Sequence, residues 1–181
     1  MPGADDAAAG RGGIRLGVDI GGVLKPHRTP ETEPRFVTSL QTTEPVPGSL
    51  ETLRRLASGG FGPRLWVVSK CRAENEEPLR AWLGRNGFLD DGLVLLTDVH
   101  FCRERADKAE IARHLRLSHF VDDRPEVMSH MDRAIHRVLF QPDRDDAAAY
   151  AASIGGVPMV ETWDDVAAAL LATLSDRVER S

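Results

Sequence analysis

The feature that most constrains this chain is the alternation of short apolar runs with stretches that have apolar residues at helical spacing. The apolar runs predict strands at 14–20, 65–68, 93–96, 120–121 and 138–140. The helical spacing predicts helices at 50–57, 78–84, 108–115 and 163–174. Strands that alternate with helices over this length favour an α/β fold with a doubly wound, mainly parallel sheet and helices on both faces.

The composition suits one such domain. The chain has 181 residues, of which 41% are hydrophobic and 28% are charged, enough for a single globular core. Residues 1–13 are small, acidic and glycine-rich, which predicts a flexible N-terminal tail. We expect 14–181 to form the domain, with the proline-rich segment 25–47 as a lid or substrate loop that holds a short strand or helix around 36–40.

Charge, cysteine content and hydrophobic runs indicate which compartment and which classes of partner suit the protein. A formal net charge of -5 argues against a broad surface for nucleic acid or for anionic membranes. No apolar run is long enough to span a bilayer, and the N-terminus lacks the features of a signal peptide. Cys71 and Cys102 lack metal-ligand spacing and indicate reduced thiols, with one surface disulfide as the open alternative. We therefore expect a cytoplasmic protein without a membrane partner.

Polar residues follow the predicted strands at the edge of the sheet where ligands bind in such folds. The first strand ends in Asp19, the second in Ser69, and the fourth in Asp122 and Asp123, while Lys108 begins the helix before the fourth strand. Three carboxylates around one point repel one another unless a cation lies among them, and oxygen ligands favour Mg2+. A lysine and a hydroxyl nearby suit phosphate oxygens, so the set favours phosphoryl transfer, with attack by a carboxylate on phosphorus.

These residues form four motifs in order along 16–141. They are DIGGVL beginning at Asp19, VVS ending at Ser69, Lys108, and FVDD ending at Asp123. In this order and spacing they resemble the motifs of the haloacid dehalogenase superfamily. The resemblance implies a Mg2+-dependent phosphatase or phosphotransferase that works through an aspartyl-phosphate and acts on a phosphorylated substrate. Nucleotide, sugar, polynucleotide and protein substrates all stay open.

The resemblance also implies roles for individual residues. Asp19 would be the nucleophile and Lys108 would bind phosphate and assist catalysis. The predicted metal ligands are Asp19, the Gly21 carbonyl, Asp122 and, in support, Asp123. The predicted substrate contacts are Ser69, Lys70, Gly22 and His27. The stretch between Ser69 and Lys108 holds one helix and one strand, which leaves no room for a large cap domain, so segment 25–47 is the cover that the sequence offers.

Gly21 departs from the family pattern. Most phosphatases of the superfamily have there a second aspartate, which protonates the leaving group and later activates water, and glycine can do neither. His27 is the nearest titratable residue that could stand in, and His100 is another. The departure supports a second hypothesis, a catalytically silent module that keeps the pocket and binds a phosphorylated ligand or partner. Activity toward an aryl phosphate, whose leaving group needs no protonation, separates the two.

Other interpretations rank below these two. The letters around Asp19 also occur in the phosphate-binding turn of actin-like sugar kinases, but such a kinase needs a longer chain with a second Asp-Gly-Gly turn. Each site residue, taken alone, could also have a purely structural role. Asp122 and Asp123, for example, precede Arg124 and Pro125 as residues at the start of a helix often do. The arginines Arg103, Arg105 and Arg124 fit either a second anionic group or a solvated face.

Overall fold

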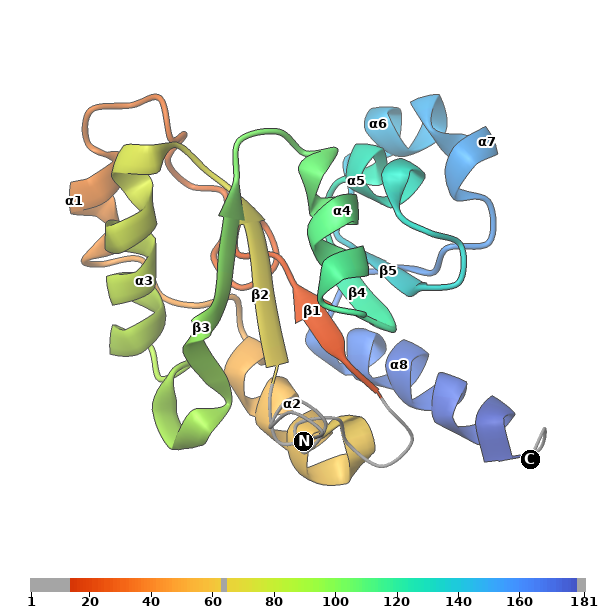
Figure 1. Cartoon of the computed structure of the whole chain (residues 1–181). Helices are drawn as coiled ribbons and strands as arrows, with labels where there is room; N and C mark the ends of the chain where they lie inside the picture. Colours follow the sequence, from red (N-terminus) through yellow and green to blue (C-terminus); the bar gives the residue numbers. More distant parts are fainter. Residues whose placement is uncertain (1–13, 63–64, 179–181) are drawn as a thin grey trace.

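One parallel sheet forms the centre of the protein (Figure 1). The structure is a computed structural model and describes residues 14–62 and 65–178, so the predicted tail 1–13 lies outside the described residues. The strands are β1 (Leu16–Val18), β2 (Leu65–Lys70), β3 (Val94–Cys102), β4 (His119–Asp122), β5 (His136–Phe140) and β6 (Met159–Val160). They lie in the order β3-β2-β1-β4-β5-β6, and each neighbouring pair is parallel.

Helices connect the strands. They are α1 (Phe36–Leu40), α2 (Ser49–Leu56), α3 (Glu76–Arg85), α4 (Asp107–His114), α5 (Pro125–His130), α6 (Arg144–Ala149), α7 (Ala151–Ile154) and α8 (Trp163–Val178). Shorter helical turns are η2 (Ala57–Phe61), η3 (Ala73–Asn75) and η4 (Asp90–Gly92). Within the described residues, none of these helices combines the length and the apolarity needed to cross a membrane.

The strands bury apolar residues on both faces of the sheet. Val67 of β2 and Val121 of β4 belong to a core that includes residues of α2, α3 and α8. Their neighbours Val68 and Phe120 point the other way, into a second core with residues of α4 and α5. Successive side chains of a strand point to opposite faces, so strands buried on both sides read as continuous apolar runs. The predicted doubly wound fold with helices on both faces is confirmed.

The strand order places the carboxyl ends of β2, β1 and β4 side by side. The chain runs outward from β1 to β2 and β3, then returns to place β4 on the other side of β1. Ligands of such sheets bind where the order reverses in this way. In Figure 1 the arrowheads of β2 and β3 point to the upper edge of the view, where the orange segment that leads into α1 also lies.

Several element boundaries differ from the prediction. β3 runs to Cys102 instead of ending at residue 96, because its second half pairs with β2 in the register Val67↔Val99 and Ser69↔Phe101. Residues 36–40 form a helix. The two-residue strand β6 and the short helices α6 and α7 were not predicted, because elements of this length show too little periodicity. The helix start that the sequence allowed before Arg124 and Pro125 is the beginning of α5. For α6 a local signal exists, since the Asp143 side chain accepts hydrogen bonds from the Asp145 and Asp146 amides.

A substitution at Gly17 tests the packing around β1. A Cβ atom at Gly17 would lie 2.5 Å from Leu117 Cδ1 and 2.7 Å from Phe120 Cδ2. Gly17→Ala should therefore lower the free energy of unfolding by about 1–3 kcal/mol, the usual effect of overpacking a core. Gly59→Ala is the matched control, because nothing lies within 4 Å of its Cβ position. Urea unfolding followed by tryptophan fluorescence measures both, and equal stabilities would contradict the packing described for β1.

Candidate functional site

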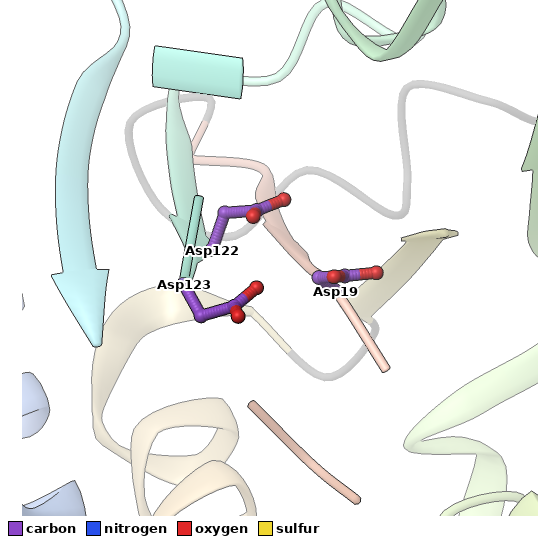
Figure 2. Close-up of side chains that lie close together, drawn as sticks. All are labelled: Asp19, Asp122 and Asp123. Atoms are coloured by element: carbon purple, nitrogen blue, oxygen red, sulfur yellow. The ribbon is translucent and has the colours of Figure 1, made fainter. Parts of the chain in front are cut away.

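Three buried carboxylates meet at the carboxyl ends of β1 and β4 (Figure 2). Asp19 follows β1 directly, Asp122 is the last residue of β4, and Asp123 comes next. One oxygen of each lies within 4.8 Å of the others. Figure 2 shows the Asp122 and Asp123 side chains extending toward the side on which Asp19 lies. The structure thus brings together the three aspartates that the sequence singled out.

Lys108 is the cation inside this cluster. Its Nζ lies 3.0 Å from Asp19 Oδ1 and 2.7 Å from Asp122 Oδ2, and its side chain is 2% exposed. Burial alone would lower the pKa of Lys108, but the two carboxylates raise it above its ordinary value. The helix α4 carries Lys108 in its first turn, and the loop after β3 delivers that turn to the ends of the neighbouring strands. Lys108 therefore stays charged in the buried cluster.

One lysine does not neutralise three carboxylates. Burial raises the pKa of Asp122 to about 7, and the charges of Asp19 and Asp123 act in the same direction, while Lys108 opposes them. The carboxylates are crowded enough to favour a bound proton or a further cation over full ionisation. This excess of negative charge is the first indication that the cluster suits a metal ion.

The hydrogen bonds of the cluster give the second indication. Asp122 Oδ1 accepts from the Arg124 amide at 2.9 Å. Asp123 Oδ2 contacts His27 Nε2 at 2.8 Å and Arg124 Nε at 3.3 Å. Asp123 Oδ1 is buried and has no hydrogen-bond partner among the described residues. A buried acceptor without a donor costs free energy unless a cation contacts it, and a set of carboxylate oxygens is what Mg2+ prefers. The residues therefore fit a Mg2+ ion.

A pocket of about 400 Å³ opens above the cluster. The predicted site residues in its wall are Asp19, Gly21, His27, Ser69, Lys70, Lys108 and Asp123. Asp122 lies outside this wall and is completely buried. Gly22 also lies outside the wall, and its amide donates to the Lys25 carbonyl at 2.7 Å. Most of the predicted residues thus share one cavity with the carboxylate cluster.

Segment 25–47 supplies a further part of the wall. Lys25, Thr29, Pro30, Glu31 and Phe36 line the pocket. The segment is fixed at its far end, where the Val46 amide donates to the Leu24 carbonyl at 2.7 Å and Trp82 Nε1 donates to the Thr43 carbonyl at 2.8 Å. The segment thus borders the pocket, and its role as a lid or substrate loop stays a prediction. The sequence singled out His27 alone in this segment, because the other residues carry no motif.

The glycines of the first loop make room for His27. Gly22 has φ +77°, and a Cβ there would lie 2.5 Å from His27 Nε2 and 2.6 Å from Asp123 Oδ2. Glycine adopts this backbone without strain and leaves space for the histidine-aspartate contact. A Cβ at Gly21 would meet His27 Cε1 at 3.4 Å, which is close but not a clash. His27 therefore borders the position where the second aspartate of the family pattern would stand.

Three other residues considered from the sequence contribute less. His100 lies in β3 and lines a different pocket, beside α4. Cys71 and Cys102 are free and buried, and burial raises the pKa of Cys71 to about 12 and that of Cys102 to about 11. Thiols with such pKa values are protonated at neutral pH and are poor nucleophiles. Cys71 and Cys102 do not form the surface disulfide that the sequence allowed as an alternative.

The three arginines are divided between the pocket and the surface around it. Arg105 and Arg124 line the pocket, and Arg103 is not part of its wall. Arg105 also pairs with Glu126 at 2.8 Å, so part of its charge is already compensated. Arg124 contacts Asp123, as described above, and is therefore tied to the carboxylate cluster.

Comparisons with known proteins show only a weak structural similarity. No family model matches the chain, and no curated protein matches it. The chain is similar to a solved structure from Burkholderia xenovorans LB400 that is named as a haloacid dehalogenase-like hydrolase, with 17% sequence identity and a TM-score of 0.49. The match covers 76% of this chain and 61% of that chain. A likeness this weak bears on neither fold nor activity, which depend here on the strand order and on the site residues.

Removing the charge of Lys108 tests whether the cluster is a buried group of charges. Lys108→Met keeps much of the side-chain volume and removes the charge, so it should lower the free energy of unfolding by about 3–5 kcal/mol at pH 8. Lys108 opposes the raised pKa of Asp122, so without the lysine this pKa should rise further in the folded state, and the loss of stability should grow as the pH rises and shrink toward pH 5. Lys70→Met is the control, since Lys70 is exposed. An equal, pH-independent loss in both variants would contradict a buried charge cluster.

Proposed function

We propose that this protein is a Mg2+-dependent phosphatase or phosphotransferase of the haloacid dehalogenase type that works through an aspartyl-phosphate at Asp19. The observation that carries the proposal is the buried cluster in which Asp19 faces Lys108 at 3.0 Å. Asp122 and Asp123 complete the cluster, and Ser69 lies in the same pocket wall. A carboxylate nucleophile, a cation and a hydroxyl beside one cavity form a set suited to a phosphoryl group.

The chain's own residues divide the work of the first step. The Asp19 carboxylate attacks phosphorus, the bond from phosphorus to the ester oxygen breaks, and the phosphoryl group stays on Asp19. Lys108 and Ser69 hold the phosphoryl oxygens, and the lysine charge compensates the charge that develops on them. Lys70 and His27 line the pocket and are proposed to contact the rest of the substrate, next to the turn at Gly22.

Mg2+ is the cofactor that the proposal assigns to the cluster. Asp19, the Gly21 carbonyl, Asp122 and Asp123 would hold it, as the buried Asp123 Oδ1 without a partner suggests. When bound, Mg2+ would withdraw electron density from the phosphoryl group and compensate its charge. We further propose segment 25–47 as the cover of the site, a phosphorylated small molecule or macromolecule as substrate, and the cytoplasm as location. The two free thiols fit a reducing compartment.

A second candidate function follows from Gly21. A silent module would keep the metal and phosphate pocket and bind a phosphorylated ligand or partner without turnover. The glycine at position 21 favours it, because glycine carries no group that can donate a proton. Release of phenol from phenyl phosphate favours the enzyme, because this leaving group departs with little protonation, and its complete absence favours the silent module.

Metal binding has a direct test. Mg2+ should raise the thermal midpoint of the wild-type protein, since a ligand of the folded state stabilises it. Asp122→Asn, which removes one carboxylate from the cluster, should show a much smaller rise in the same titration. Asp145→Asn, on an exposed position of α6, should respond like the wild type. Equal rises in all three proteins would contradict the metal site.

The nucleophile has a separate test. Asp19→Asn keeps the shape of the side chain and removes the attacking charge, so release of phosphate from phenyl phosphate should fall by about three orders of magnitude or more. Circular dichroism should show that the variant keeps its fold. A variant that still turns over at the wild-type rate would limit Asp19 to a role as metal ligand.

A further inference from the structure

We propose that Glu31, on the segment that covers the pocket, is the general acid and base that Gly21 lacks. This inference rests on the proposed function, because it assigns a second catalytic group to the same phosphoryl transfer. An alkyl phosphate needs a proton on its leaving oxygen, and the aspartyl-phosphate needs an activated water. Glycine at position 21 supplies neither, so a working enzyme must place another titratable group beside Asp19.

The backbone fixes Glu31 at the pocket. Pro30, Glu31, Thr32 and Glu33 form a turn that is closed by the Glu33 amide, which donates to the Pro30 carbonyl at 3.0 Å. Both Pro30 and Glu31 line the pocket that contains Asp19 and Ser69. Ser69 and Lys70, at the end of β2, line the same pocket. Glu31 therefore shares the pocket wall with the strand end that carries Ser69.

The surroundings of Glu31 suit a group that must both give and take a proton. Burial raises the pKa of Glu31 above its ordinary value, and the Asp19 charge acts in the same direction. Lys70, the Arg72 amide and Lys25 act against this rise and do not cancel it. A carboxyl whose pKa is raised toward the working pH exchanges protons in both directions, which a general acid and base requires.

Several other titratable groups of the pocket wall already contact neighbouring residues. His27 Nε2 contacts Asp123 at 2.8 Å, and Lys25 Nζ donates to the Pro26 carbonyl at 3.1 Å. Arg105 pairs with Glu126, and Lys108 holds two carboxylates of the cluster. Among the carboxyls in the pocket wall, Asp19 and Asp123 belong to the cluster, which leaves Glu31 as the carboxyl outside it.

The proposed chemistry balances over two steps. In the first, Asp19 attacks phosphorus, the electron pair of the ester bond goes to the leaving oxygen, and the protonated Glu31 carboxyl gives that oxygen its proton. In the second, the Glu31 carboxylate takes a proton from water, the water oxygen attacks phosphorus, and the electron pair of the bond to Asp19 returns to Asp19. The products are an alcohol and inorganic phosphate, and Glu31 is protonated again.

The experiment compares Glu31→Gln with Glu33→Gln in the full chain with Mg2+. Glu33 lies two residues further along the same turn, pairs with Arg35 at 2.6 Å and is not part of the pocket wall. Phenyl phosphate and ethyl phosphate are the probes. With ethyl phosphate, Glu31→Gln should lower kcat by about 10²–10⁴-fold, the usual contribution of a positioned acid, while Glu33→Gln stays within about 2-fold of the wild type.

Phenyl phosphate gives the more specific signature. Its leaving group needs little protonation, so Glu31→Gln should still release about one equivalent of phenol per protein and then stall, because no base activates water. Intact-mass spectrometry should show the phosphorylated protein in this variant and no such species when Asp19→Asn is added. A residue that only anchors the covering segment would slow both substrates and would not trap the intermediate.

The outcomes separate the two proposals. If Glu31→Gln hydrolyses ethyl phosphate at the wild-type rate and no phosphorylated protein accumulates, the role of Glu31 is wrong while the aspartyl-phosphate mechanism stands. If His27→Gln gives the burst and the trapped protein instead, His27 is the acid and base and the assignment to Glu31 is overturned. If the wild type releases neither phenol nor phosphate, the proposed enzymatic function itself fails, and the role of Glu31 fails with it.

Discussion

The buried charge of Lys108 is the constraint on which the rest of the site depends. Its ammonium group lies between Asp19 and Asp122 at the centre of the carboxyl edge of the sheet. Burial raises the pKa of the completely buried Asp122, and the charge of Lys108 opposes this rise. The lysine thus compensates part of the carboxylate charge, and the charge that remains fits the divalent cation proposed for the cluster.

The fold brings these charges together from distant parts of the sequence. β1 is flanked by β2 and β4, so Asp19, Ser69 and Asp122 end neighbouring strands although they are far apart along the chain. Lys108 reaches the same point because α4 begins there, after the crossover from β3. Each position follows from parallel pairing and a crossover connection, so the site requires no unusual backbone apart from the turn at Gly22.

The sequence predicted the part of the site that lies at the ends of apolar runs. Asp19, Ser69 and Asp122 could be named because a strand buried on both faces ends visibly where polar residues begin, and the ends of parallel strands meet. Glu31 and Lys25 could not be named in this way. Their place in the pocket depends on the turns of the segment after β1, which leave no periodic pattern. The true length of β3 was missed for a related reason, since its second half becomes a strand by pairing with β2.

The glycine turn at positions 21 and 22 and the path of segment 25–47 are physically connected. Gly22 lets the chain turn back after β1 at φ +77°, so that Gly21 and Lys25 form a bridge and His27 approaches Asp123. A larger side chain at Gly22 would collide with this histidine, and one at Gly21 would press against it. The tight turn directs the following residues across the pocket instead of away from it, and this brings Pro30 and Glu31 into its wall. A loop with glycine at position 21 can therefore bring a carboxyl, that of Glu31, to the same cavity from ten residues further along the chain.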